Sequence, residues 1–294
     1  MLKLTLTALT LIIALCTPCA AAAEEAGEVP FTFEKGYVIV EATIKGKEPV
    51  QVIIATGAEY STVGGEMLEK YKLQAYYTGV PPVTGRNDRT INFAKVPDLR
   101  VGPAGENLDM RLGSTGDFSR VLGRDIFAVL GHDFLKGRAV QFDFGKRVLR
   151  FLDKPAAEAL RRKSGAAVLP MTEKGDLFGR TLTLPLVDKV MFNDKPAKVL
   201  LDTGIVTAVA LSSSTAKRLG FEPPPENGEA RADSIRSLRF GPVEVSDVPV
   251  TLFPKGSGVG ARLGDGGALA GSALLQNFVA TFDYRGRVVI LERI

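Results

Sequence analysis

The sequence contains no tryptophan, two cysteines and one histidine. Both cysteines, Cys16 and Cys19, lie near the N-terminus, so the rest of the chain can form no disulfide, offer no thiolate nucleophile and bind no zinc through cysteine. The single histidine, His132, would have to serve any Ser-His-Asp triad, yet no Gly-x-Ser-x-Gly segment accompanies it. We therefore expect neither a metal nor a cofactor, and we interpret His132 as a packing or surface residue.

The sequence also lacks a strong excess of one charge sign. It has 37 Lys and Arg residues against 33 Asp and Glu residues, a formal net charge of +4 at pH 7, and the two signs are well mixed. Aromatic residues do not alternate with basic ones, as they do in nucleic-acid grooves. A nucleic acid is therefore not an expected partner.

Long apolar runs are absent except at the N-terminus. Lys3 precedes an almost purely apolar run, Leu4 to Leu15, and small residues continue to Ala23. This pattern is typical of a secretory signal peptide over residues 1–23, and the run is too short for a comfortable membrane span. We expect an exported chain, periplasmic or extracellular, with no stable membrane span after cleavage; a retained N-terminal anchor is the alternative.

The two halves of the remaining chain repeat a set of short segments in the same order. Val-Ile-Ile-Ala-Thr-Gly at 52–57 corresponds to Val-Leu-Leu-Asp-Thr-Gly at 199–204, so that Ala55 and Asp202 are 147 residues apart. An apolar-apolar-Gly segment and a Phe-Asp-aromatic segment then recur, each 140 residues apart. Such ordered recurrence predicts an internal duplication and two similar lobes.

The predicted elements divide the chain into two strand-rich lobes. Runs of alternating apolar residues bounded by Gly, Pro, Asn and Asp predict strands, and each x-Thr-Gly segment is followed by one short helix. A further helix with Pro near its start is predicted in the linker, residues 153–170. The expected lobes are residues 24–152 and 171–294, and the expected fold class is all-β with short helices.

The chemistry of paired x-Thr-Gly loops depends on the residue before the threonine. If each loop supplied an aspartate, two carboxylates would share one proton, and a water between them could be activated to attack a carbonyl group. One loop supplies Asp202, but the other has Ala55, which can neither accept a proton nor orient water. The sequence therefore predicts a two-part site from which one reactive group is missing.

These segments resemble the pepsin and retropepsin superfamily of aspartyl proteases, most closely the two-lobed bacterial exported type. The residues that carry the resemblance are Leu-Leu-Asp-Thr-Gly at 200–204, Ile-Ile-Ala-Thr-Gly at 53–57, Val-Leu-Gly at 129–131 and Leu-Ala-Gly at 269–271. The resemblance implies two β-barrel lobes related by a pseudo-two-fold axis, with a peptide-binding cleft between them. The apolar-apolar-Gly segments would pack behind the catalytic loops.

The resemblance also implies roles for individual residues. Asp202 would be catalytic, and Ala55 would stand at the matching position of the dyad. Glu59 would bind the substrate backbone, although a solvated loop glutamate is the other interpretation. Residues 78–93 would form a flap over the cleft, unless they are a loop without that role. The residues expected to brace the two loops are Thr56, Gly57, Thr203 and Gly204.

Three hypotheses for function follow. In the first, a monomer binds peptides or unfolded polypeptide in the cleft, with proteolysis lost or strongly impaired by Ala55, so that the chain is a pseudoenzyme. In the second, the scaffold is that of an active aspartic endopeptidase, either with an Asp replaced at position 55 or with a second chain supplying another Asp202. In the third, the chain is an exported interaction module without catalysis.

Overall fold

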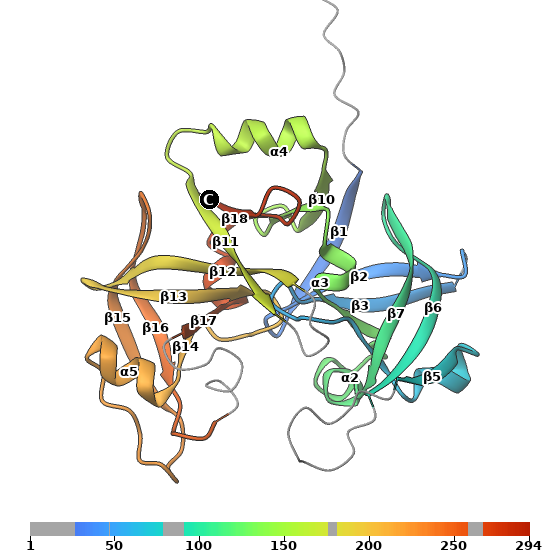
Figure 1. Cartoon of the computed structure of the whole chain (residues 1–294), viewed down its shortest axis with the longest axis horizontal. Helices are drawn as coiled ribbons and strands as arrows, with labels where there is room; N and C mark the ends of the chain where they lie inside the picture. The colour runs from blue at the N-terminus through green and yellow to red at the C-terminus, as the bar shows by residue number, and fades with distance from the viewer. Residues whose placement is uncertain (1–26, 47, 79–90, 176–180, 258–266) are drawn as a thin grey trace, which may run out of the picture.

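The computed structural model describes residues 27–46, 48–78, 91–175, 181–257 and 267–294. The predicted signal peptide and most of the flap candidate lie outside these ranges. Figure 1 shows two strand-rich lobes side by side, with the linker helix α4 across the top. In the described residues, no helix is both long and apolar enough to cross a membrane.

The first lobe is built mainly of antiparallel strands with three short helices among its described residues. In chain order the elements are β1 (Glu28–Glu34), β2 (Tyr37–Ile44), β3 (Glu48–Ile54), β4 (Thr62–Gly64), α1 (Met67–Lys70), β5 (Gln74–Thr78), β6 (Ile91–Val101), β7 (Ala104–Gly113), α2 (Gly116–Leu122), β8 (Ala128–Leu130), α3 (His132–Leu135), β9 (Ala139–Asp143) and β10 (Val148–Leu152).

The linker helix and the second lobe follow. The elements are α4 (Lys154–Arg161), β11 (Ala167–Gly175), β12 (Thr181–Phe192), β13 (Lys195–Asp202), β14 (Val209–Leu211), α5 (Ser213–Leu219), β15 (Arg231–Phe240), β16 (Val243–Leu252), β17 (Gly267–Gly271), α7 (Ser272–Leu275), β18 (Phe278–Asp283) and β19 (Val288–Arg293). The short helices predicted after the two x-Thr-Gly segments are present as α1 and α5.

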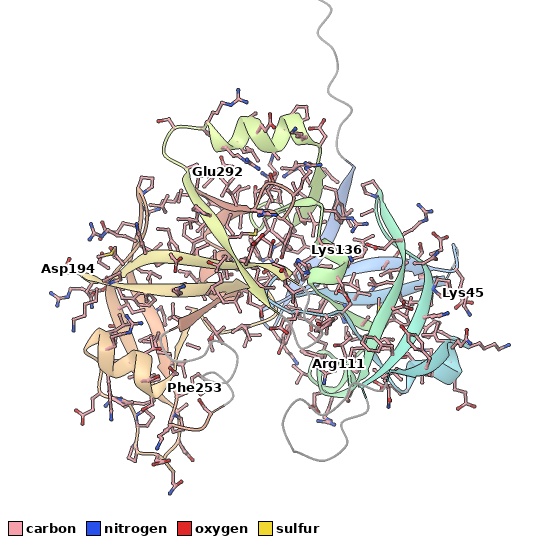
Figure 2. All side chains as sticks on the ribbon, in the orientation of Figure 1. Lys45, Arg111, Lys136, Asp194, Phe253 and Glu292 are labelled. Carbon is pink, nitrogen blue, oxygen red and sulfur yellow. The ribbon has the colours of Figure 1, made fainter. Side chains whose placement is uncertain are left out.

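The two lobes use the same strand pairings. β3 runs parallel to β8, and β13 runs parallel to β17 in the other lobe. β4 then pairs antiparallel with β8 and parallel with β7, while β14 pairs antiparallel with β17 and parallel with β16. Figure 2 shows Lys45 and Asp194, at the β2–β3 and β12–β13 turns, at opposite ends of the molecule. The strand pairings of the first lobe thus recur in the second lobe, in the same order as the repeated sequence segments.

A sheet shared by both lobes reveals the pseudo-two-fold axis. Among the described strands its order is β1–β10–β9–β18–β19–β11, and all pairings are antiparallel. At its centre β9 meets β18, where Gln141 lies opposite Thr281. These two residues are 140 positions apart, so each faces its own counterpart in the other lobe, and the Gln141 side-chain amide donates to Thr281 Oγ1 at 3.2 Å. The predicted all-β class with two pseudo-two-fold-related lobes is confirmed.

The hydrophobic core crosses this central sheet. One cluster of buried residues contains side chains from both lobes, and Phe142 packs edge-on against its counterpart Phe282 with ring centroids 5.6 Å apart. Burying one aromatic side chain of this size removes about 150–250 Å² from water. The lobes are therefore joined by a common core as well as by strand pairing.

The linker helix is fixed to the second lobe at its C-terminal end. Asp153 caps α4 by accepting the Ala156 N–H at 2.8 Å. Arg161 forms an ion pair with Asp283, whose side chain is only 2% exposed, and Lys163 pairs with Glu292. Figure 2 shows Glu292 beneath α4. β11 begins at residue 167, inside the segment expected to be linker, because the chain re-enters the central sheet there.

Candidate active site

The candidate site lies where β3 and β13 end and their following loops meet. Each strand lies between an antiparallel and a parallel neighbour, and its last residues are buried on both faces of the sheet. Apolar side chains at 52–54 and 199–201 satisfy this double burial. The x-Thr-Gly segments then turn away from the strands, and the two turns face each other across the pseudo-two-fold axis.

Two threonines bind the loops to each other reciprocally. Thr56 Oγ1 donates to the Leu201 carbonyl at 2.9 Å and accepts the Thr203 N–H at 3.1 Å. Thr203 Oγ1 donates to the Ile54 carbonyl at 2.6 Å and accepts the Thr56 N–H at 3.2 Å. Both threonines are fully buried. The sequence predicts hydrogen bonds from each threonine to the opposite loop, and these contacts are present.

Asp202 receives N–H groups from both loops. Its side-chain oxygen Oδ1 accepts the Gly204 N–H at 2.8 Å and the Gly57 N–H at 3.1 Å. Asp202 is 1% exposed, and Ala55, on the opposite loop, is 3% exposed. The loop that carries no carboxylate therefore donates its glycine amide to the carboxylate of the other loop.

Glycine is required at both positions after the threonines. A Cβ atom on Gly57 would lie 2.7 Å from Asp202 Cβ, and one on Gly204 would lie 2.7 Å from Ala55 Cβ. These separations are shorter than real Cβ contacts, so any side chain would push the loops apart. Gly57 and Gly204 therefore permit the close approach of the two loops.

The apolar-apolar-Gly segments pack behind the loops, as the resemblance implies. A Cβ atom on Gly131 would lie 2.8 Å from the Ala58 carbonyl oxygen, and one on Gly271 would lie 2.2 Å from the Ile205 carbonyl oxygen. The following residues donate their N–H groups to these same carbonyl oxygens, at 2.8 Å and 2.7 Å. The two glycines therefore let β8 and β17 support the loops at contact distance.

Tyr284 is a site residue that the sequence reasoning missed. Its hydroxyl donates to the Thr56 carbonyl oxygen at 2.7 Å, across 228 residues of sequence. Burial raises the pKa of Tyr284 well above 10.0, and the negative charge of Asp202 adds to the rise. The only sequence signal was the change from Phe144 to Tyr284 between the two Phe-Asp-aromatic segments.

Ser61 and Asp133 brace the first loop on its other side. Asp133 Oδ1 accepts from the Ser61 N–H at 2.8 Å and from the Ser61 hydroxyl at 2.5 Å, while Ser61 Oγ accepts the Gly131 N–H at 2.9 Å. Burial raises the pKa of Asp133, and the hydrogen bonds from Ser61 oppose that rise. His132 is buried with its ring edge-on to Tyr284, in agreement with its interpretation as a packing residue.

The predicted roles of Glu59 and of the flap candidate, residues 78–93, are not tested by the described structure. Glu59 is half-buried in the loop after Gly57. The flap candidate is described only at its base, where β5 and β6 pair from Gln74 opposite Lys95 to Thr78 opposite Ile91. The roles of both remain predictions.

Asp143 and Asp283 each accept a backbone N–H within a hairpin turn. Asp143 Oδ1 accepts the Lys146 N–H at 3.0 Å, and Asp283 Oδ1 accepts the Gly286 N–H at 2.7 Å. In the part of the chain that the structure describes, no group of His, Cys, Asp or Glu side chains could hold a metal ion.

Comparison with known proteins gives one family match. Residues 188–266, which include Asp202, match the family model described as Aspartyl protease. A similar solved structure is a retropepsin-like aspartic protease from Rickettsia conorii, with 20% sequence identity, 43% of this chain and 89% of that chain covered, and a TM-score of 0.30. No curated protein matches. The second lobe is thus similar to aspartyl proteases around the loop that carries Asp202.

Proposed function

We propose that this chain binds extended peptides or unfolded polypeptide between its two lobes, and that it hydrolyses them weakly or not at all because Ala55 stands where a second catalytic Asp would be. Asp202 is the proposed catalytic position. Thr56, Gly57, Thr203 and Gly204 are proposed to brace the loops. The match of residues 188–266 to aspartyl proteases supports the general class of the site.

The observation that carries the proposal is the meeting of the two loops on one carboxylate. Asp202 Oδ1 accepts an N–H from each loop, and the two threonines bond reciprocally. Such an arrangement supports a single site made by both lobes. We infer that the lobes arose by duplication of one ancestral half-site.

The loss of activity follows from the chemistry of the missing group. A water between two carboxylates is activated when one of them takes its proton, and a methyl group at position 55 leaves that water with one carboxylate. Removing a positioned acid–base group typically lowers a rate by about 10²–10⁴-fold. Peptide binding by main-chain strand pairing needs no second carboxylate, so binding is expected to survive.

A binding measurement tests the first part of the proposal. We expect the unaltered chain to bind an unfolded polypeptide and a pepstatin-type inhibitor, measured by calorimetry from acidic to neutral pH. Asp202 is only 1% exposed, so inhibitor binding also tests whether a ligand can reach its carboxylate. The matched control is Asp202→Asn, which keeps the shape of the side chain and should weaken inhibitor binding. Absence of binding at every pH would favour the interaction-module hypothesis.

A cleavage assay tests the second part. The same polypeptide, incubated with the unaltered chain, should remain intact or be cut only very slowly. Robust cleavage that the inhibitor blocks would instead show an active endopeptidase and overturn the proposed role of Ala55.

We also propose that the chain acts after export, in the periplasm or outside the cell, and as a monomer. The apolar N-terminal run supports export. The monomer follows from the pairing of the two loops within one chain, which leaves no matching position for a loop from a second copy. Sedimentation of the mature chain at the mass of a dimer would contradict the monomer.

A further inference from the structure

We propose that Tyr284 is a positioning residue that orients the peptide unit between Thr56 and Gly57, and through this unit the N–H that Gly57 donates to Asp202. The hydroxyl of Tyr284 donates to the carbonyl of this peptide unit at 2.7 Å. The N–H at the other end of the same unit donates to Asp202 Oδ1 at 3.1 Å. One planar group thus connects the phenol to the carboxylate.

Because the peptide bond is planar, the Thr56 carbonyl and the Gly57 N–H cannot reorient independently of each other. The carbonyl and N–H of a trans peptide point in opposite directions in one plane, so fixing the carbonyl direction also fixes the N–H direction. Hydrogen bonds in such a chain polarise one another, which strengthens each of them in a buried setting. Tyr284 is buried, with a relative exposure of 4%, and the Thr56 and Gly57 positions are buried as well.

The arrangement is asymmetric between the lobes. The position that corresponds to Tyr284 in the first lobe is Phe144, which has no hydroxyl and packs edge-on against Phe31 and Phe33. At this pair of corresponding positions, only the second lobe has a hydroxyl, and this hydroxyl bonds to the opposite loop. This hydroxyl acts on the loop that carries Ala55, which has no side-chain carboxylate of its own to receive the Gly57 N–H.

The electrostatics agree with this geometry. The negative charge of Asp202 is among the causes that raise the pKa of Tyr284. Because the raised pKa keeps the phenol protonated at neutral pH, the hydroxyl remains a donor to the Thr56 carbonyl there. At neutral pH the Tyr284 hydroxyl therefore donates to the peptide unit whose N–H bonds to Asp202.

The first test removes only the hydroxyl. In Tyr284→Phe, we expect amide hydrogen exchange of Gly57 to become faster by about 2- to 12-fold, the range for the loss of one neutral hydrogen bond. The Gly57 amide proton should also shift upfield in the NMR spectrum, whereas the Gly204 amide, which lies within the second loop, should change little. Phe144 shows that a phenylalanine is compatible with the corresponding position of the fold.

The matched control is Tyr37→Phe, which removes a hydroxyl from a half-buried tyrosine that packs edge-on against Phe118. It should leave both glycine amides unchanged. A purely structural hydroxyl at Tyr284 would lower stability without a selective effect on Gly57, and that result would overturn the proposal.

A second measurement needs no variant and remains available if Tyr284→Phe fails to fold. In the unaltered protein, a coupling across the hydrogen bond between the Gly57 nitrogen and the Asp202 carboxyl carbon is expected in the NMR spectrum. If this coupling is absent and the Gly57 amide exchanges as fast as a solvent-exposed amide, the proposed positioning of the Gly57 N–H by Tyr284 is contradicted. The inference rests on the proposed function only in treating the two loops around Asp202 as a ligand site. These measurements require no catalysis, so failure of peptide binding or of cleavage would be distinguishable from failure of this positioning.

Discussion

At the scale of single residues, the site consists of one carboxylate held by groups from both loops. Asp202 Oδ1 accepts two N–H groups, and Tyr284 fixes the peptide unit that provides one of them. The sequence singled out Asp202, Ala55 and the two threonines because they stand at corresponding places of a repeat, and the structure places them where the two loops meet. It could not reveal Tyr284, because a contact across 228 residues depends on how the strands pair.

Alkaline pH should weaken the fold through Tyr284. Its pKa in the folded chain lies well above the ordinary 10.0, so the unfolded chain loses the proton first. The stabilising contribution is therefore complete below about pH 10 and is lost as the pH rises towards the folded pKa. Tyr284→Phe cannot titrate at this position. We expect the stability advantage of the unaltered protein over Tyr284→Phe, measured by urea unfolding, to shrink between pH 8 and pH 11; a constant difference would contradict this.

Acidic pH should stabilise the fold through Asp133. Burial raises its folded pKa above 3.8, so the folded chain takes up the proton before the unfolded chain does. The stabilising contribution of the protonated form is present at low pH and is lost as the pH rises through the folded pKa. Asp133→Asn keeps the shape and cannot titrate. The unaltered protein should therefore gain stability relative to Asp133→Asn as the pH falls from 7 to 4, in paired denaturant titrations that cancel the effects of other groups.

At the scale of elements, the x-Thr-Gly loops and the strands behind them act as one unit. The short apolar strands, the turn glycines and the helices after the loops were predictable, because local periodicity specifies them and Ser212 caps α5. The partners of each strand were not predictable from local pattern. The parallel pairings of β3 with β8 and of β13 with β17 join segments about 70 residues apart, and the resemblance alone suggested that these segments meet.

The reciprocal threonine bonds should contribute substantially to stability. Thr56→Val leaves the Leu201 carbonyl and the Thr203 N–H without a buried partner, and each unsatisfied group costs about 1–3 kcal/mol. We expect a loss of about 2–4 kcal/mol in the free energy of unfolding for Thr56→Val, and a similar loss for Thr203→Val.

The control for this prediction is Thr43→Val in β2. Thr43 is half-buried, and we expect a change within about 0.5 kcal/mol, as for most substitutions away from buried polar networks. Equal losses in the free energy of unfolding for Thr43→Val and Thr56→Val, measured by chemical denaturation, would contradict a large contribution from the hydrogen bonds between the loops.

At the scale of the whole molecule, the central sheet makes the two lobes interdependent. β9 and β18 pair across the pseudo-two-fold axis, and the core crosses the same boundary. The recurrence of short segments in the sequence predicted two lobes, but the sequence did not show that they would share one sheet. That arrangement depends on the register at Gln141 and Thr281, which no local pattern specifies.

Separated lobes should therefore be unstable. Residues 24–152 and residues 153–294, expressed apart, would each expose an unpaired strand edge and an apolar face at the central sheet. We expect each fragment to be largely unfolded or aggregated by circular dichroism and gel filtration, and a mixture refolded together to recover the native spectrum. Two independently folded, monomeric fragments would contradict the shared core.

The central claim is that one missing carboxylate limits a site that is otherwise complete. The most direct measurement is the rate at which Ala55→Asp cleaves an unfolded polypeptide at acidic pH, beside the unaltered chain and the double variant Ala55→Asp with Asp202→Asn. The account predicts a rate at least about 10²-fold above that of the unaltered chain, blocked by a pepstatin-type inhibitor and abolished in the double variant. A correctly folded Ala55→Asp protein that binds the inhibitor yet cleaves no faster than the unaltered chain would contradict it.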